Sequence, residues 1–517
     1  MVSSNAVAMS NRVLRALAAT VVLALAGAAS ADSPGTPEKP AAPAAAPTVG
    51  CPVTPKDARP LVRKPGVKVP APAVTANAGL GPTCRPPPAA SRACMKKQPL
   101  CPRDLEIAKI AWKYFENNYQ PKTGLVNSAD GYPSTSIWDA ASTLGATLAA
   151  FELGLITDKQ LDERVTGLMG ALSAQKLFEG KAPNKAYSSV TNEMTDYNNN
   201  PTEGIGYSAL DLARMVSMVN VLTCFQPRYA DTAAALLQRW NYCDLSKSGQ
   251  MYGVYVDPAT KKPVLAQEGR LGYEQYGGKA LARVGFDQHV SSTYDNGFAA
   301  TVDIYEVPIR YDKRDSKTLG AYNYVVTESY ALDAMEFGLD EQNRPLLRNI
   351  FEVQKRRWQR TGRVTAVSED NVDRDPWFIY NTIFVEGTPW KAITDTGYDQ
   401  EALKTVSVKA AFSLAALFPE DPYSDVLMEK IANAYDPNKG WYSGVYENGT
   451  GYNRSLTANT NGIILEALAY RMYGPLHQLC RSCGRGLRWD PEVVQSKYGQ
   501  EHCLPGAPAP TPKTASR

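Results

Sequence analysis

Seven carboxylates lie where long polar loops run into stretches of small and apolar residues. They are Asp139, Glu203, Glu268, Glu274, Glu328, Glu386 and Glu447. A pair of such groups can hydrolyse a glycosidic bond, because one carboxylic acid protonates the leaving oxygen while the other carboxylate activates water or attacks carbon. Each of them can instead be a helix cap or one partner of an ion pair.

Glu274 is the predicted general acid of this set. It lies one turn into an apolar stretch flanked by glycine and aromatic residues, where desolvation would raise its pKa. The alternative role is that of a buried ion-pair partner for Arg270 or Lys279. The predicted partner carboxylate is Glu447, on a loop rich in Gly and Asn, or Asp139.

Flat aromatic side chains in the same loops suit the faces of pyranose rings. The predicted sugar-binding residues are Trp138, Tyr273, Trp377, Trp441 and Tyr446. Aromatic residues often pack in a core instead, so each of them has that alternative. The loops are longer than ordinary connections, which favours a binding role.

Chemistry that depends on a metal or a cofactor is not expected. The chain holds three histidines, and two of them, His477 and His502, lie at the end that carries cysteines. A catalytic metal with histidine ligands is therefore not predicted. One further mechanism stays open, a polysaccharide lyase in which His289, Tyr294 and Asn296 serve as base and charge neutraliser.

Six stretches of small and apolar residues must position these loops. They begin near Ser136, Gly204, Glu268, Thr327, Val406 and Asn459. Charged, amphipathic stretches lie between most of them, as inner helices packed on both sides and outer helices with a wet face would require. The pattern predicts an all-α (α/α)6 toroid, a double ring of helices with long loops lining one open end. The weakest expected outer helix falls between Arg283 and Asn323.

Composition divides the chain into four predicted parts. Residues 1–31 carry two arginines before an apolar run that ends in Ala-Ser-Ala, which predicts a signal peptide cleaved after Ala31. The other parts are a Pro/Ala-rich linker with cysteines (32–100), the glycan-acting domain (101–480) and a Cys-bearing, disordered tail (481–517). We expect a periplasmic or secreted protein without a membrane span in its mature chain. The net charge is only +3 and the basic residues are dispersed, so no nucleic-acid partner is expected.

Nine cysteines in an exported chain favour disulfides. Cys224 and Cys243 flank one predicted helix and could form a local bridge. The cysteines before and after the body could fasten the ends of the chain together. A zinc site built on Cys480 and Cys483 is the alternative.

Several segments resemble the bacterial family known as domain of unknown function 3131. The resemblance covers residues 105–473 and rests on TGLVNS, SIWDAAS, EGRLGYEQYGGKAL, WFIYNTIFVEGTPW and ANTNGIILEALAYR. More distantly, the chain is similar to glycoamylase-like proteins and to β-1,2-glucanases related to glycoside hydrolase family 144. That resemblance implies an (α/α)6 barrel with a Glu-bearing inner helix, matched by Tyr273 and Glu274, and a late Tyr-Gly-x-Tyr-Asp segment. Here Glu447 stands where that segment has Asp.

The leading hypothesis is an exported glycoside hydrolase that acts on a bacterial glucan or exopolysaccharide. Its expected partner is a polysaccharide or oligosaccharide. The alternatives are a non-catalytic glycan-binding or envelope-assembly protein and the polysaccharide lyase. Two carboxylates facing a deep aromatic cleft would favour an enzyme, whereas carboxylates paired to arginine would favour a binding protein.

Overall fold

The computed structural model describes residues 97–319, 321–482 and 484–487 of the 517-residue chain. The predicted signal peptide and most of the predicted linker and C-terminal tail lie outside the described residues.

Six helices of small and apolar residues contact one another in cyclic order. α3 packs on α5, α5 on α7, α7 on α9, α9 on α11, α11 on α13, and α13 on α3 again. Each of the six stretches of small and apolar residues therefore contains a helix, and these six are hereafter called the inner helices. They are α3 (Ile137–Glu152), α5 (Ala209–Phe225), α7 (Tyr273–Arg283), α9 (Thr327–Leu332), α11 (Val408–Leu417) and α13 (Ala458–Tyr473).

Residues with hydroxyl side chains cap the N-termini of four of the six inner helices. Ser136, Ser208, Ser407 and Thr457 each accept a hydrogen bond from the third backbone N–H of the helix that follows. Such N-caps satisfy donors that would otherwise be left without partners. α7 begins differently, after Gly272 with φ +105°, where an added Cβ would lie 2.5 Å from Ser329 Oγ of α9. Glycine thus allows α7 to approach α9 closely.

The second layer contains the amphipathic helices α2 (Pro102–Asn117), α4 (Asp158–Ala174), α6 (Ala230–Gln238), α10 (Asn343–Thr361) and α12 (Pro422–Lys430). Between α7 and α9, where the sequence pattern of an outer helix is weak, the chain forms a hairpin of β9 (Ala299–Ile304) and β10 (Val307–Asp312). The short helix α8 (Ser316–Leu319) follows it.

Short strands are more numerous than the sequence pattern predicted. The largest sheet joins β5 (Gly206–Tyr207), β6 (Ser246–Lys247), β7 (Gln250–Val256) and β8 (Pro263–Gln267). Two three-stranded sheets contain β11 (Glu369–Asn371), β12 (Phe378–Asn381) and β15 (Ala392–Ile393), and β16 (Thr405–Ser407), β19 (Gly444–Tyr446) and β20 (Tyr452–Asn453).

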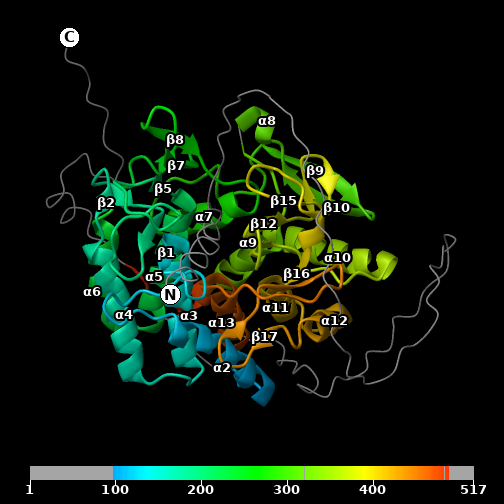
Figure 1. Cartoon of the computed structure of the whole chain (residues 1–517), viewed down its shortest axis with the longest axis horizontal. Helices are drawn as coiled ribbons and strands as arrows, with labels where there is room; N and C mark the ends of the chain where they lie inside the picture. The colour runs from blue at the N-terminus through cyan, green and yellow to red at the C-terminus, as the bar shows by residue number, and fades with distance from the viewer. Residues whose placement is uncertain (1–96, 320, 483, 488–517) are drawn as a thin grey trace, which may run out of the picture. The chain divides into compact units, whose positions relative to one another are not determined.

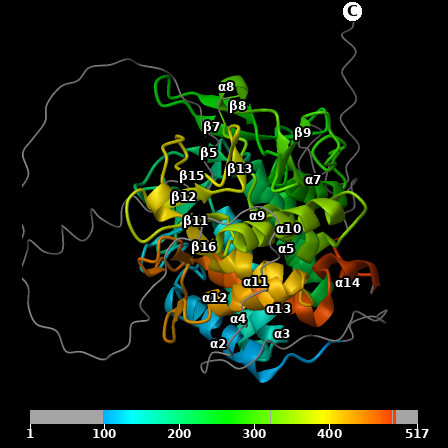
Figure 2. The same cartoon turned by 90° about the vertical axis from the view of Figure 1, so that its right-hand side faces the viewer.

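Two-residue and three-residue pairs make up the rest of the described strands: β1 (Ser134–Ser136) with β4 (Ala186–Ser188), β2 (Leu177–Phe178) with β3 (Ala182–Pro183), β13 (Phe384–Val385) with β14 (Thr388–Pro389), and β17 (Tyr435–Asp436) with β18 (Gly440–Trp441). In both views, β5, β7, β8, β9, β12 and β15 lie toward one end of the helices (Figures 1 and 2). The prediction of a helix-rich fold is confirmed, but all-α is too narrow a description.

A buried ion network occupies the centre of the six helices. Arg214 of α5 lies 2.9 Å from Glu336, in the π-helical turn that continues α9, and 3.2 Å from Glu466 of α13. Its guanidinium also faces the ring of Trp138 on α3, 4.9 Å from the centroid. The network thus joins α5, the turn that continues α9, and α13. Leaving any one of its charges unpaired would be costly.

The cysteine pairing differs from the predicted local bridge. Cys224 of α5 forms a disulfide with Cys480 of α14 (Leu476–Ser482), 256 residues away in the chain, rather than with Cys243. Cys101 and Cys243 are disulfide-bonded as well. The bridge of Cys480 excludes the zinc site that was considered for Cys480 and Cys483, because a disulfide sulfur has no thiolate to bind a metal.

No helix within the described part of the chain has both the length and the apolar composition needed to cross a membrane.

Candidate active site

A pocket opens at the N-terminal ends of the six inner helices. It encloses about 760 Å³, its open mouth included. Each inner helix contributes a residue of its first turn: Trp138 and Asp139 from α3, Leu210 from α5, Tyr273 from α7, Glu328 from α9, Lys409 from α11, and Asn459 and Thr460 from α13. Helix N-termini carry partial positive charge, which favours carboxylates at this position.

Four carboxylates line this pocket, and each is almost completely buried. The exposed fractions are 2% for Asp139, 3% for Glu328, 8% for Glu369 and 1% for Asp370. Glu369 and Asp370 come from β11, at the pocket wall formed with β12. Sequence reasoning weighed Glu328 among the candidates but missed Glu369 and Asp370.

Glu328 is held by two donors from neighbouring helices. Lys409 Nζ lies 2.5 Å from Glu328 Oε2, and Asn459 Nδ2 lies 3.1 and 3.2 Å from the two carboxylate oxygens. The amide of Asn459 is oriented in turn, because its Oδ1 accepts hydrogen bonds of 3.2 Å from Trp138 Nε1 and from Ser142 Oγ. Three inner helices thus fix the position of one carboxylate.

Asp139 lies in the first turn of α3, beside the Ser136 hydroxyl that caps the helix. Ser136 Oγ donates to Asp139 Oδ2 over 2.6 Å and accepts a hydrogen bond from Asp139 N at 3.0 Å. Burial raises the pKa of Asp139, and the hydroxyls of Ser128 and Ser136 and the charge of Lys409 oppose that shift. A carboxyl group whose pKa is shifted by burial in a pocket is a candidate for a functional residue.

Burial shifts the pKa values of both Glu369 and Asp370 in the pocket wall. Burial raises the pKa of Glu369 to about 7, with the Lys409 ammonium opposing the shift. Burial also raises the pKa of Asp370 well above its usual range, against Lys409 and the nearby hydroxyl of Ser407. No described residue forms a hydrogen bond of acceptable geometry with either oxygen of Asp370, and Lys409 Nζ lies 3.7 Å from Oδ1.

Aromatic rings complete the lining. They are Trp138, Tyr273, Tyr324, Phe378 and Tyr380. Trp138 meets Tyr273 edge to face at 5.7 Å, and Tyr324 stacks on Tyr380 at 4.2 Å between ring centroids. Of the predicted residues, the structure therefore brings Trp138, Asp139 and Tyr273 together in one pocket; their roles stay predictions.

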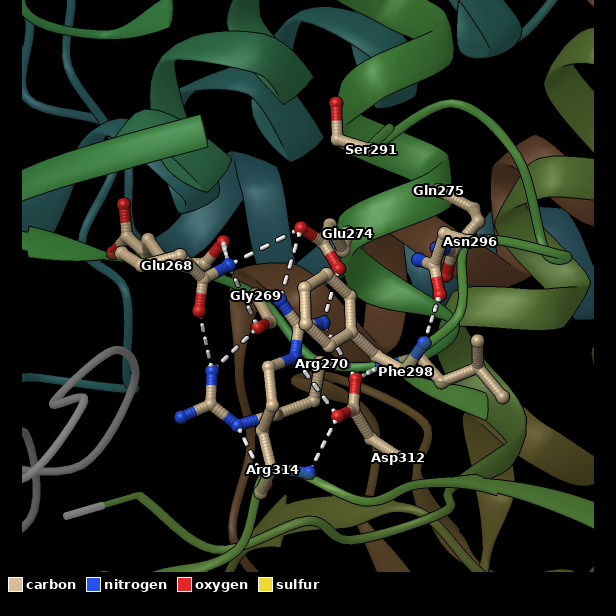
Figure 3. A network of polar contacts seen from close by, with 12 residues as sticks. Glu268, Gly269, Arg270, Glu274, Gln275, Ser291, Asn296, Phe298, Asp312 and Arg314 are labelled. Carbon is tan, nitrogen blue, oxygen red and sulfur yellow. Dashed lines mark hydrogen bonds and ion pairs between the residues drawn. The ribbon is translucent and has the colours of Figure 1, made fainter. Parts of the chain in front are cut away.

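Glu274 does not line this pocket. Its side chain is fully buried and is ion-paired with Arg314, which also binds Asp312 over 2.6 Å and stacks on Phe298 with the guanidinium carbon 4.2 Å from the ring centroid (Figure 3). Burial raises the pKa of Glu274, as the sequence suggested, while Arg314 opposes the shift. The ion-pair alternative is thus realised with Arg314, a residue 40 positions away in the chain.

The remaining predicted residues also lie outside the pocket lining. Glu447 forms a two-pronged ion pair with Arg357, with N···O distances of 2.7 and 2.9 Å. Trp441 is buried and donates to the carbonyl oxygen of Ile107 over 3.1 Å. Tyr446 donates to Asp373 over 2.6 Å, and Trp377 is half-buried.

The residues considered for a lyase do not meet in the pocket. His289 is exposed and contacts Asp287 at 2.7 Å, whereas Tyr294 is buried and donates to Asp333 over 2.8 Å. Neither lines the pocket. Within the described residues, no group of three or more His, Cys, Asp or Glu side chains has the arrangement of a metal site.

Comparison with known proteins identifies relatives of this body. The model of the family described as "Protein of unknown function (DUF3131)" matches residues 106–474. No curated protein matches the sequence.

Two solved structures resemble it in fold. A putative glucoamylase from Bacteroides caccae is 15% identical, with a TM-score of 0.53 over 76% of this chain and 98% of that chain. An endo-β-1,2-glucanase from Chitinophaga pinensis, in complex with sophorotriose and glucose, is 14% identical, with a TM-score of 0.53 over 77% of this chain and 98% of that chain. At such low identity the likeness concerns the fold.

Proposed function

The chain belongs to the DUF3131 family of proteins of unknown function, and we propose that it is an exported glycoside hydrolase that acts on a bacterial glucan or exopolysaccharide. The single observation that carries this proposal is the pocket in which four buried carboxylates face aromatic rings. Sugar-binding pockets combine flat apolar faces with a few polar groups that fix the orientation of the ring. The names of the two similar structures agree with this function class.

We assign the fold as an (α/α)6 toroid in which the β9–β10 hairpin occupies the place of one outer helix. The cyclic contacts among the six inner helices support this assignment. In such a ring the loops that enter the inner helices meet at one end, and the pocket lies at that end.

Glu369 is our candidate for the general acid. Its pKa of about 7 keeps a substantial share of the carboxyl protonated at neutral pH, which a group that protonates a glycosidic oxygen requires. Asp139 is the candidate partner carboxylate, as the sequence predicted. Glu328, fixed by Lys409 and Asn459, is suited to orienting sugar hydroxyls.

The pairing of the carboxylates favours an enzyme over a non-catalytic binding protein. Glu274 and Glu447 are each ion-paired with an arginine outside the pocket. The residues that line the pocket include no arginine, and their one cation, Lys409, lies 2.5 Å from Glu328 and 3.7 Å from Asp370. The carboxyl groups of the pocket are therefore available to a substrate.

Disulfides in the body agree with export to an oxidising compartment, where the predicted signal peptide would direct the chain.

Mutation of the pocket acids tests the proposal. Reducing ends released from a panel of glucans and exopolysaccharides are measured with the wild type, Glu369→Gln, Asp139→Asn and Glu274→Gln. We expect each of the first two variants to lose roughly 100-fold or more in kcat, because an acid or base contributes about that much. Glu274→Gln is expected to keep the kcat of its folded fraction. Full activity in Glu369→Gln and Asp139→Asn would remove both residues from the mechanism.

A further inference from the structure

The pocket holds more acidic groups than cations. Its lining contains four carboxyl groups, Asp139, Glu328, Glu369 and Asp370, against one cation, Lys409. The ammonium of Lys409 lies 2.5 Å from Glu328 and 3.7 Å from Asp370, so its charge is directed mainly to Glu328. Burial raises the pKa values of Glu369 and Asp370, so a cation that binds beside them displaces their protons.

Asp370 presents oxygens without a well-formed hydrogen bond. It exposes 1% of its surface, and neither oxygen accepts a hydrogen bond of good geometry from the described residues. The Ser407 hydroxyl and the Lys409 ammonium, 3.7 Å from Oδ1, are nearby polar groups. A buried carboxylate without donors is costly unless a ligand supplies them. The phenol oxygen of Tyr273, in the same pocket, is also buried without a hydrogen-bond partner among the described residues.

Aromatic rings line the same pocket as these acceptors. Tyr380 lies opposite Glu369 in the pairing of β11 with β12, and Tyr324 stacks on Tyr380. Trp138 and Tyr273 line the same pocket. Aromatic rings combined with carboxylates attract organic cations, through the negative faces of the rings and through charge.

We propose that the sugar held in this pocket carries a protonated primary amine, so that the substrate is a glycan with free, de-N-acetylated amino sugars. This inference rests on the proposed function in taking the ligand to be a sugar. An ammonium group has donors and no acceptor, which matches the poorly satisfied oxygens of Asp370 better than a hydroxyl does. A uronic acid would add a fifth carboxyl group to a pocket whose one cation, Lys409, is already held by Glu328. A metal ion is the competing cation, and no group of three or more His, Cys, Asp or Glu side chains among the described residues is arranged to hold one.

Binding to matched sugars tests the inference without knowledge of the linkage. The methyl glycosides of glucosamine and galactosamine are titrated into the protein by calorimetry beside those of glucose, galactose, N-acetylglucosamine and glucuronic acid. We expect the amines to bind roughly tenfold tighter than the neutral sugars, since a charge-assisted hydrogen bond contributes about 1.4 kcal/mol or more. Burial raises the pKa values of Glu369 and Asp370, so binding of a cation near pH 6 should also release protons, seen as an enthalpy that depends on the buffer.

Two variants locate the effect. Asp370→Asn keeps the shape of the side chain and removes its charge, and is expected to abolish the preference for the amine. Asp295→Asn, at a side chain that is 83% exposed, is the matched control and should keep it. If Asp370→Asn does not fold, the affinities of the wild type for amine and neutral sugars, together with the proton release, still test the inference.

The possible outcomes separate this inference from the proposed function. Equal affinity for amine and neutral sugars, tighter binding of the N-acetylated or acidic sugar, or no binding at all would overturn the inference. Hydrolysis of a neutral glucan without any preference for amines would overturn it while leaving the hydrolase intact. Selective binding of amines by a protein that cleaves no amino-sugar oligomer would uphold it and contradict the hydrolase.

Discussion

Burial of Glu369 links the stability of the protein to pH. The pKa of this carboxyl is about 7 in the folded protein and about 4.5 in an unfolded chain, so the folded state holds more protons between these values. Below about pH 4.5 this group makes its full contribution to the free energy of unfolding. That contribution, about 3 kcal/mol, is lost as pH rises through 7. The side chain of Glu369→Gln is neutral at every pH, so the variant does not lose stability in this way.

Denaturant unfolding of both proteins at a series of pH values from about 5 to about 8 measures the difference. The stability of Glu369→Gln relative to the wild type should rise across this range. A difference that stays constant with pH would mean that Glu369 does not titrate in this window.

Asn459 positions Glu328 and should act through it. Asn459→Asp removes the amide that donates to Glu328 and sets a second carboxylate against it, so we expect kcat to fall about tenfold or more and the pH–rate profile to shift. Asn461→Asp is the matched control, because Asn461 lies on the same helix but bonds the backbone of Trp441 outside the pocket. It should lose stability without a shift in the profile. The same shift in both variants would argue against a positioning role for Asn459.

At the scale of elements, Arg314 fastens the β9–β10 hairpin to α7. It lies two residues after β10 and pairs with Asp312 at the end of that strand and with Glu274 of α7 (Figure 3). Arg314→Met would leave two buried carboxylates without their cation, and we expect a loss of about 3–5 kcal/mol in the free energy of unfolding. Glu274→Gln should cost less, since a neutral amide can still accept from Arg314. An Arg314→Met variant as stable as the wild type would contradict this role for the network.

The helical elements were largely predictable because their signals are local. Each of the six stretches of small residues became an inner helix, and hydroxyl caps such as Ser136 and Thr457 stand at their starts. The hairpin could not be predicted, because the sequence between Arg283 and Asn323 shows only a weak helical pattern and no clear pattern of strands. Its strands are fixed by mutual pairing and by the contact of Arg314 with α7.

The candidate site was predictable only in part. Trp138, Asp139 and Tyr273 were identified because they stand at inner-helix starts, and those starts converge on the pocket. Glu369 and Asp370 were missed because they lie on β11, outside any helix start; their signal was a pair of adjacent acids before the aromatic strand β12. Glu274 attracted attention by its apolar flanks, but such flanks suit a buried ion pair equally, and Arg314 is distant in the sequence.

At the scale of the whole molecule, the disulfide between Cys224 and Cys480 joins α5 to the C-terminal helix α14 across 256 residues. Linking such distant residues restricts the unfolded chain, with an upper estimate of about 5 kcal/mol from chain entropy. A variant with both cysteines changed to alanine should therefore unfold at lower denaturant concentration. Adding a reductant should destabilise the wild type more than this variant. Equal midpoints for the two proteins without reductant would show that the bridge contributes nothing to stability.

The central claim is that the buried carboxylates of the pocket direct water to a glycosidic bond. The most direct measurement is mass spectrometry of the products formed from a panel of neutral and amine-bearing polysaccharides in water enriched in heavy oxygen, with the wild type and Glu369→Gln. We predict shortened chains that carry one heavy oxygen per cleavage with the wild type, and almost none with Glu369→Gln. Unsaturated products without the label, or intact polysaccharide that only binds, would contradict the account.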